Sequence, residues 1–453
     1  MAAKTIPRFE QYQDWYARVF ARKIGETARA HGIAEGQGTR MLSKTVTWQV
    51  TDSCNLACTY CYQGNKGKRV MPLEVGKAFA DWLLSRTPEN CDYINPVTSP
   101  SIILEFIGGE PFLQVELIGQ ILDYWESRCI QLDHPWLENF MVSICSNGVK
   151  YFDPEVQAFL RRWKGRLSFS ISIDGNQALH DACRVFPDGS PSYELAVAGA
   201  MDWMRRGGHM GSKITLAPGN IRHAYQAIRH MYDLGYREIN ANCVYEKGWE
   251  LEHAQILYRQ MKLLADFLAE EAEPTYCSLF EKKFFRPMDE EDNTNWCGGT
   301  GFMLSCDPDG FIYPCIRYME SSLGCDVKPL RLGNVWEGLE TTQEERDLVK
   351  DLQAVTRRSQ STDECFYCPI AAGCSWCSAY NYQDTGSYNK RATYICVMHK
   401  ARALANVYYW GKRYRLGLED APMELHCPKA WALPIIGEEE YAMLASLAKE
   451  GSP

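Results

Sequence analysis

The sequence lacks the features that mark a membrane protein or a nucleic-acid-binding protein. No uninterrupted apolar stretch reaches the roughly 18 residues needed to cross a bilayer, and the first residues contain no continuous apolar segment of the secretory type. There is no long run of Lys and Arg, and the net charge is −9, so a polyanionic partner is not indicated. We therefore expect a cytoplasmic protein that binds neither membranes nor nucleic acid.

What the sequence has in abundance is cysteine, at 19 of 453 positions. Disulfides are rare in the cytosol, so metal or cluster ligation is the leading explanation for the cysteines that lie in groups. Scattered cysteines are more often small buried side chains. The groups are Cys54, Cys58 and Cys61; Cys297, Cys306 and Cys315; and Cys365, Cys368, Cys374, Cys377 and Cys396.

Short apolar, β-branched runs alternate with amphipathic stretches in the first half of the chain. The alternation predicts an α/β fold with a parallel sheet and helices outside it, either an open sheet or a partial barrel. Ligands of such folds bind at the carboxyl ends of the strands. The predicted strands are 45–50, 102–107, 140–145, 167–173, 213–217 and 238–245.

Four of these strands are followed or ended by loops rich in glycine, polar residues or cysteine. The stretch TDSCNLACTYCYQ (51–63) follows the first strand, GGEP (108–111) the second and SNG (146–148) the third, and DG (174–175) ends the fourth. Because the carboxyl ends of parallel strands meet at one edge, we expect these loops to form one active site.

The spacing CX3CX2C in the first loop is unlikely to be accidental, since chance gives about 0.03 such patterns in a chain of this cysteine content. A structural zinc site is closed by four ligands, and a catalytic zinc site usually includes His or a carboxylate. A [4Fe-4S] cluster held by three thiolates keeps one iron open for a substrate or cofactor. The loop therefore favours a cluster with an open iron.

This loop, placed after the first strand of a βα alternation and with Tyr60 before its third cysteine, resembles the radical S-adenosylmethionine superfamily. The resemblance implies a partial (βα)6 TIM-like barrel. It also implies a cluster whose open iron binds the amino and carboxylate groups of S-adenosyl-L-methionine. In that family the reduced cluster cleaves the cofactor to methionine and a 5'-deoxyadenosyl radical, which makes Cys54, Cys58 and Cys61 the catalytic ligands.

The same resemblance implies contacts to S-adenosylmethionine. Tyr60 and Leu216 correspond to positions against the adenine, and GGEP runs alongside the methionyl amino group. Ser172 and Arg184 correspond to residues that hold the ribose or carboxylate, which an arginine pairs through two donors. The residues implied to bind the cofactor are Tyr60, Gly108, Gly109, Glu110, Ser172, Arg184 and Leu216.

The C-terminal cysteines resemble the SPASM extension, whose pattern is CX9-15GX4C, then CX2CX5CX3C, then C. Here the spacing before Cys377 is X2 instead of X3, and a zinc ribbon is the structural alternative for this element taken alone. The resemblance implies two auxiliary [4Fe-4S] clusters. Cluster one would use Cys297, Cys315 and Cys377, with Cys277, Cys306 or no protein residue as fourth ligand, and cluster two would use Cys365, Cys368, Cys374 and Cys396.

These features together predict five segments. They are an N-terminal helical extension (1–44), the barrel (45–250), a linking helical segment (251–295), a cysteine-rich SPASM iron-sulfur domain (296–400) and a C-terminal helical tail (401–453).

The nearest resemblance is to maturases of peptides with CXXX repeats. It implies an enzyme that forms thioether crosslinks in a ribosomally made precursor peptide with a leader and a Cys-rich core. The acceptor would be a residue such as Asp or Glu, and a flavodoxin or ferredoxin would act as reductant. Cluster one would take the electron released on bond formation, and, where no protein residue is its fourth ligand, its open iron would bind the substrate thiol.

Other functions stay open. A sulfatase-type maturase would make formylglycine, but that family has an Asp base directly after the cysteine that corresponds to Cys315, where this chain has Ile316. A peptide maturase could form a carbon-carbon crosslink or an epimerised residue instead. A non-catalytic metal-binding scaffold would explain the cysteines but not GGEP, Ser172 and Arg184 at strand ends.

Overall fold

The computed structural model describes residues 43–91, 93–271, 275–295 and 297–449. The helix expected within 1–44 lies almost entirely outside these residues. Within the described ranges, no helix is both long and apolar enough to cross a membrane.

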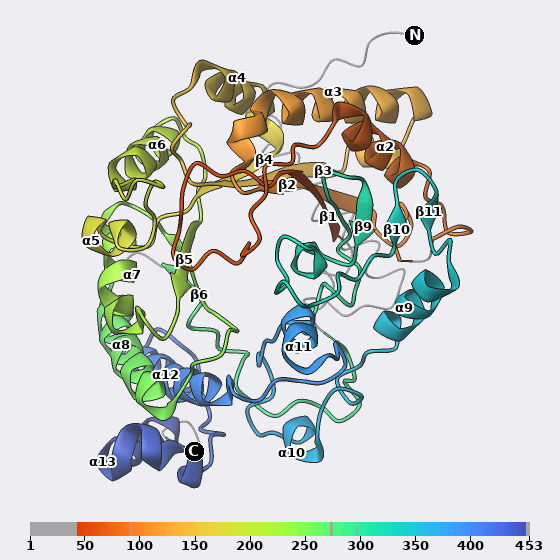
Figure 1. Cartoon of the computed structure of the whole chain (residues 1–453). Helices are drawn as coiled ribbons and strands as arrows, with labels where there is room; N and C mark the ends of the chain where they lie inside the picture. Colours follow the sequence, from red (N-terminus) through yellow and green to blue (C-terminus); the bar gives the residue numbers. More distant parts are fainter. Residues whose placement is uncertain (1–42, 92, 272–274, 296, 450–453) are drawn as a thin grey trace.

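Six parallel strands surround the centre of the molecule, with helices on their outer side (Figure 1). Parallel pairing in register places Val46 beside Leu104 and Leu104 beside Val142. The strands match the predicted ranges closely, and the predicted partial (βα)6 barrel is confirmed. They are β1 (Ser43–Thr51), β2 (Ser101–Gly108), β3 (Phe140–Ser146), β4 (Leu167–Ile171), β5 (Ser212–Leu216) and β6 (Glu238–Cys243).

The outer faces of the strands pack against the helices through large apolar side chains. Trp48 of β1 is fully buried, and its ring lies 4.8 Å from Phe79 and 5.3 Å from Phe106 between ring centroids. Burial of aromatic side chains is a large stabilising contribution. The helices are α2 (Leu73–Leu84), α3 (Val115–Leu132), α4 (Pro154–Trp163), α5 (Gln177–Asp181), α6 (Tyr193–Arg205), α7 (Ala224–Asp233) and α8 (Leu251–Glu270).

The barrel is split between β4 and β5. These neighbouring strands belong to different sheets, one running from β4 through β1 and the other containing β5, β6 and β7 (Tyr276–Cys277). A cavity of about 650 Å³ lies between them, lined by Phe169 and Ser170 on one side and Ser212 and Lys213 on the other.

The cysteine-rich region extends the barrel sheet and is not a detached unit. Its first strand, β8 (Ser305–Cys306), pairs in parallel with β1, so that Thr47 lies beside Ser305. This pairing covers the β1 edge, which would otherwise expose unpaired backbone groups. The remaining elements are β9 (Phe311–Tyr313), β10 (Gly333–Asn334), β11 (Gly338–Leu339), α9 (Gln343–Gln353), α10 (Asp363–Phe366) and α11 (Ser378–Thr385).

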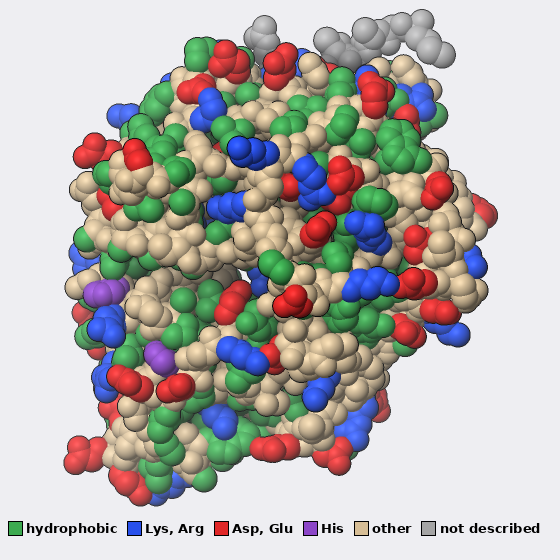
Figure 2. All heavy atoms as spheres, in the orientation of Figure 1, with side chains coloured by type: hydrophobic (Ala, Val, Ile, Leu, Met, Phe, Trp, Pro, Cys, Tyr) green, Lys and Arg blue, Asp and Glu red, His purple; other side chains and the backbone are tan. Residues whose placement is uncertain are grey.

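The last helices pack back onto the barrel. Helix α12 (Cys396–Arg415) contacts α8, and α13 (Lys429–Lys449) contacts both. The boundary predicted between residues 400 and 401 therefore falls inside α12, because the helix starts at the cysteine that ends the predicted SPASM pattern. Near the centre of the ring of elements, Figure 2 shows a hollow in the surface, with acidic and basic side chains interspersed around it.

Candidate active site

Cys54, Cys58 and Cys61, the loop triad, lie together in the loop that follows β1. The loop is held against the segment after α5 by backbone hydrogen bonds, in which Ala57 N donates to Val185 O (2.8 Å) and Thr59 N to Cys183 O (3.0 Å). These bonds bring the triad beside Arg184, which is far away in the sequence.

The sulfur atoms of the loop triad have donors around them. Cys54 Sγ accepts from the Leu56 amide at 3.4 Å, and Asn147 Nδ2 lies 3.9 Å from it. Arg184 Nη1 lies 4.0 Å from Cys58 Sγ. Burial raises the pKa of the Cys58 thiol, and the Arg184 charge opposes that shift. Donors and a cation around the sulfurs suit thiolates bound to metal, which lose their protons on binding.

The GGEP segment is held against the start of the same loop. Gly109 N donates to Thr51 O at 3.0 Å, and a Cβ atom on Gly109 would lie 2.3 Å from Ser53 O. The close approach that this glycine permits is therefore to the protein's own backbone. Glu110 is buried and accepts from Ser146 Oγ and the Asn147 amide, both at 2.8 Å. The Glu110 amide also donates to Ser53 O at 2.9 Å, so Glu110 ties together the loops after β1, β2 and β3. Burial raises the pKa of the Glu110 carboxyl.

Tyr60, Asp174 and Arg184 form a second cluster at this edge of the barrel. The Tyr60 hydroxyl donates to Asp174 Oδ2, and Arg184 Nε donates to the same oxygen at 2.8 Å. The Arg184 guanidinium lies 5.4 Å from the centre of the Tyr60 ring. Asp174 Oδ1 is buried and has no hydrogen-bond partner among the described residues. Such an atom marks a place where a ligand donor is missing.

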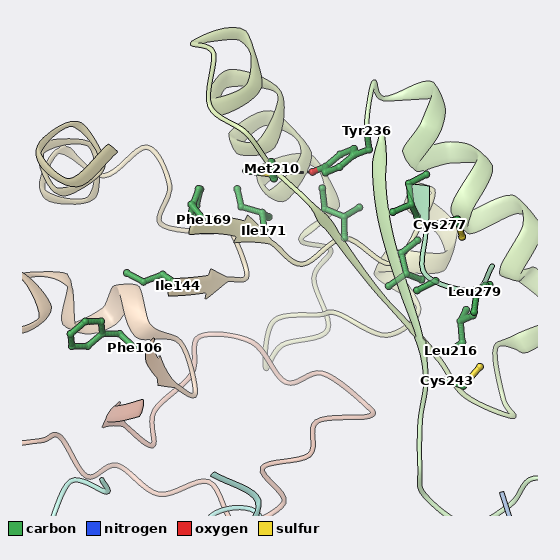
Figure 3. Close-up of a cluster of buried hydrophobic side chains, with 14 of the residues drawn as sticks. Phe106, Ile144, Phe169, Ile171, Met210, Leu216, Tyr236, Cys243, Cys277 and Leu279 are labelled. Atoms are coloured by element: carbon green, nitrogen blue, oxygen red, sulfur yellow. Dashed lines mark hydrogen bonds between the residues drawn. The ribbon is translucent and has the colours of Figure 1, made fainter. Parts of the chain in front are cut away.

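Ser172 and Leu216 lie in different surroundings. Ser172 Oγ is 3.3 Å from Cys145 Sγ, close to the loop edge. Leu216 is 2% exposed and lies with Cys243 among the buried hydrophobic side chains of Figure 3. Because side chains alternate along a strand, Thr215, which is half-buried, lies on the other face of β5. Leu216 is therefore packed among buried hydrophobic side chains at the carboxyl end of β5, and its predicted contact with adenine stays a prediction.

Cys297, Cys315 and Cys377, the distal triad, come from three separate segments. The pKa of the Cys315 thiol is raised mainly by burial, and the neighbouring Cys377 and Cys297 thiols add to this increase. Of the two cysteines considered as fourth ligand, Cys306 lies in β8 beside Trp48 and donates to Asp307 O at 3.5 Å. The other, Cys277, pairs with Ile239 in the second sheet.

The cysteines predicted for auxiliary cluster two line a common cavity of about 450 Å³. Arg391 also lines this cavity, and its Nη1 donates to Cys365 Sγ at 3.6 Å. A cation at this position suits an anionic cluster. The four cavity cysteines are Cys365, Cys368, Cys374 and Cys396.

All 19 cysteines lie in the described part of the chain, and none is in a disulfide. Within that part, no three His, Cys, Asp or Glu side chains are arranged to hold a single metal ion. The assignment of clusters therefore rests on the spacing in the sequence and on which cysteines share a neighbourhood.

Segments next to the loop triad contact segments next to the distal triad. Tyr62 follows Cys61, and the Arg317 guanidinium lies 5.3 Å from the centre of its ring. Arg317 follows Cys315 by two residues and pairs with Glu246 at 3.2 Å. Asn65 Nδ2 donates to Leu323 O at 2.8 Å. The first loop of the barrel is therefore packed against the SPASM-like region.

A family described as a 4Fe-4S single cluster domain matches residues 34–161, a range that contains the loop triad and GGEP. The serine-type anaerobic sulfatase-maturating enzyme of Bacteroides thetaiotaomicron is 22% identical, over 76% of this chain and 84% of its own. The mycofactocin maturase MftC of Mycolicibacterium smegmatis is 26% identical, over 67% and 72%.

Two solved structures share the fold. Native anSMEcpe with bound AdoMet and Kp18Cys peptide matches with a TM-score of 0.60 at 17% identity, covering 83% of this chain and 98% of that one. Streptococcus suis SuiB bound to precursor peptide SuiA matches with a TM-score of 0.51 at 14% identity, covering 84% and 80%. This is the fold of a radical S-adenosylmethionine enzyme with a SPASM extension.

Two residues lie at the sites but were not singled out by the sequence motifs. Asp174 was noted only as part of the DG that ends a strand, and its pairing with Tyr60 and Arg184 depends on the folded loops. Cys427 is 3% exposed and lies near Cys368. It falls outside every cysteine spacing pattern, so the sequence carries no signal for it.

Proposed function

We propose that this protein is a radical S-adenosylmethionine enzyme and a peptide maturase that forms Cys thioether crosslinks in a ribosomally made, Cys-rich precursor. Some relatives are named as maturases, and some structural neighbours are solved with a bound peptide. Both support the assignment as a peptide maturase, without specifying the bond that is formed. They include a maturase of mycofactocin and structures with a bound peptide or precursor peptide.

The observation that carries the proposal is the contact between the segments next to the two triads. Tyr62 links the loop of the first triad to Arg317, next to the second. A crosslink between a thiol and a carbon removes two hydrogen atoms from the peptide, so the reaction needs an electron acceptor close to the substrate. A distal cluster beside the substrate site would meet that need.

The donor sets fit the proposed cofactors. The loop triad would hold the cluster that binds S-adenosyl-L-methionine, the distal triad auxiliary cluster one and the cavity cysteines auxiliary cluster two. When bound, the clusters and S-adenosylmethionine supply one-electron chemistry and a 5'-deoxyadenosyl radical, and a flavodoxin or ferredoxin is the proposed reductant.

The chain's own residues would bind and orient the cofactor. Asp174 Oδ1 is buried without a partner, so it is available to accept a hydrogen bond from a cofactor hydroxyl or amino group. Arg184 donates to Asp174 through Nε, which leaves other guanidinium donors for a carboxylate. Glu110 fixes the three loops relative to each other through the bonds of its carboxylate to Ser146 and Asn147 and of its amide to Ser53 O. Such preorganisation lowers the cost of holding the cofactor in a reactive orientation.

The test uses the anaerobically reconstituted protein with S-adenosylmethionine, dithionite and a synthetic precursor peptide with a Cys-rich core. We expect 5'-deoxyadenosine and a peptide lighter by the mass of two hydrogens per crosslink, with the cysteine no longer open to alkylation. The matched control is the same peptide with each core Cys replaced by Ser.

Two outcomes would contradict the proposal. Modification of the Ser-substituted peptide would indicate a carbon-carbon crosslink or an epimerised residue in place of a thioether. No 5'-deoxyadenosine from a protein loaded with all of its iron would contradict the catalytic assignment itself.

A second candidate function is formylglycine formation, since a sulfatase-maturating enzyme is among the relatives. The residue after Cys315 argues against it, because Ile316 has no group that can act as a base. Incubation with a peptide carrying a sulfatase-type Ser or Cys, followed by an aldehyde-reactive probe, separates this candidate from the first.

A further inference from the structure

Ser378 occupies a position where the SPASM pattern has cysteine. The pattern ends its central element with CX3C, but here only two residues separate Cys374 from Cys377, so this cysteine comes one position early. The residue four places beyond Cys374, with three residues between, is Ser378. A serine hydroxyl is a shorter and harder donor than a thiol, yet it offers an oxygen at the same place.

The structure places the Ser378 hydroxyl among the distal triad. Ser378 is fully buried as the first residue of α11, and its Oγ lies 3.0 Å from Cys297 Sγ. A Cβ atom on Gly299 would lie 3.1 Å from Cys315 Sγ and 3.2 Å from Ser378 Oγ, so both atoms border the same small volume. The third cysteine, Cys377, precedes Ser378 in the chain. The Ser378 oxygen therefore lies with the sulfurs of Cys297 and Cys315, and the Cys377 thiol is an electrostatic neighbour of both cysteines.

The two cysteines considered as fourth ligand lie in the sheets instead. Cys306 lies in β8 between β1 and β9, and its thiol donates to the Asp307 carbonyl. Cys277 lies in β7 of the second sheet and pairs with Ile239. Ser378 already adjoins the distal triad, and Tyr318 donates to its Oγ at 2.9 Å, which orients the hydroxyl.

We propose that Ser378 is the fourth protein ligand of auxiliary cluster one and binds, through Oγ, the iron that the three cysteines leave open. The inference rests on the cluster assignment made under the proposed function. On metal binding the serine hydroxyl proton is released to solvent, as protons are released from cysteine ligands. Tyr318 keeps its proton and donates to the bound oxygen. With all four irons coordinated by protein, this cluster would accept an electron but would not bind the substrate thiol.

The test removes the other open iron first. The full chain carrying Cys54→Ala, Cys58→Ala and Cys61→Ala is reconstituted with ⁵⁷Fe, reduced and exposed to ¹³C-cyanide, which binds an iron that lacks a protein ligand. With Ser378 present we expect no ¹³C hyperfine coupling in the electron-nuclear double resonance spectrum, and a Mössbauer component for an oxygen-ligated iron. With Ser378→Ala we expect a ¹³C coupling to appear. With Ser378→Cys the oxygen-ligated component should disappear and no coupling should arise.

Two control variants separate ligation from hydrogen bonding. Tyr318→Phe removes the donor but keeps the serine oxygen, so it should show no ¹³C coupling. Ser99→Ala removes a buried hydroxyl that has no hydrogen-bond partner in the described structure and lies in a different segment, before β2. It should leave both spectra unchanged.

The proposal is overturned if ¹³C coupling appears while Ser378 is intact, or if Ser378→Ala retains its iron and shows no coupling. If Ser378→Ala loses its iron, Ser378→Cys decides, because a spectrum unchanged from that of the serine protein would also overturn the proposal. No peptide is needed, so these results do not depend on the thioether activity. Iron for only one cluster in the triple variant would instead contradict the cluster assignment on which the proposal rests.

Discussion

The loop triad and the distal triad each bring three cysteines together, but by different means. The loop triad lies within one loop after β1, whereas the distal triad is drawn from segments that start at Cys297 and end at Cys377. Each triad has an arginine paired with a carboxylate. Arg184 and Asp174 are 2.8 Å apart with little exposure, and Arg317 and Glu246 are 3.2 Å apart at a more open position.

The polar atoms around the two triads differ in a way that bears on function. Near the loop triad, the buried Asp174 Oδ1 has no partner in the described structure. Near the distal triad, the Ser378 and Tyr318 hydroxyls bond to each other. Because buried polar atoms are nearly always paired, Asp174 Oδ1 indicates a place for an added hydrogen-bond donor near the loop triad, whereas the Ser378 and Tyr318 hydroxyls already have each other as partners. The proposed open cluster at the loop triad and the proposed closed cluster at the distal triad are consistent with this difference.

The largest expected effect comes from removing one thiol from each triad. Cys58→Ala should lower 5'-deoxyadenosine formation by more than about 100-fold, since even outer-shell partners of metal ligands contribute 10–100-fold. Cys377→Ala should keep 5'-deoxyadenosine formation but lose peptide modification, because only the electron acceptor is damaged. Both products are measured by mass spectrometry after anaerobic incubation. If both variants lose 5'-deoxyadenosine formation equally, with iron retained at the loop triad, the two triads do not have the separate roles proposed here.

The parts of the molecule that depend on local sequence were predictable. Apolar β-branched runs predicted β1 to β6, and the CX3CX2C spacing located the loop triad. The GGEP and SNG loops were expected to meet at one edge, and Glu110 joins them through Ser146 and Asn147. In each case the deciding interaction lies within one loop or follows from the geometry of a parallel sheet.

The parts that depend on chain folding over long distances were not predictable. The strand β8 is two residues long, so no periodicity marks it, and its pairing with β1 joins the SPASM region to the barrel. Asp174 and Ser378 each form a hydrogen bond with a residue more than fifty positions away in sequence, so their place at the sites could not be predicted from local sequence. Leu216 lies at the carboxyl end of β5, close to the predicted strand end, and its contact with the cofactor stays a prediction.

An intermediate effect should come from the carboxylate beside each triad. Asp174→Asn removes the charge that pairs with Arg184 and one oxygen that can accept from the cofactor. We expect the KM for S-adenosylmethionine to rise about 10–100-fold, the range for partners that orient ligands of a metal site. The measurement is initial-rate 5'-deoxyadenosine formation at varied cofactor concentration.

The matched control is Glu246→Gln, which breaks the corresponding pair with Arg317 next to the distal triad. It should leave the KM for S-adenosylmethionine within about twofold, since surface-accessible pairs contribute little. A similar rise in KM in both variants would mean that the cofactor contacts both arginines, which would merge the two sites into one.

The smallest expected effect is a loss of stability around the loop triad at acid pH. His180 is buried beneath this site, where its Nδ1 accepts from the Asp174 amide at 3.4 Å and its Nε2 lies 3.1 Å from Ser192 Oγ. Burial lowers the pKa of His180 from 6.5 to about 4. Between these values the unfolded chain binds the proton and the folded chain does not, so the free energy of unfolding falls as the pH drops from 6.5 towards 4.

In His180→Gln, the free energy of unfolding should fall by about 1 kcal/mol less than in the wild-type protein between pH 6.5 and 4. This is less than the full pKa shift would give, because burial in a protein is never complete desolvation. Thermal unfolding of the anaerobic protein at several pH values gives the curve, and His209→Gln, which changes an exposed histidine, serves as control. His399 is also buried, with its pKa lowered to about 3, but its contribution is the same in all three proteins.

At pH 5, amide exchange around Asp174 and Arg184 should be faster in the wild-type protein than in His180→Gln, while exchange around Cys315 and Tyr318 should be the same in both. Equal loosening around both triads would show that the acid response is global and that the two sites share one folding unit.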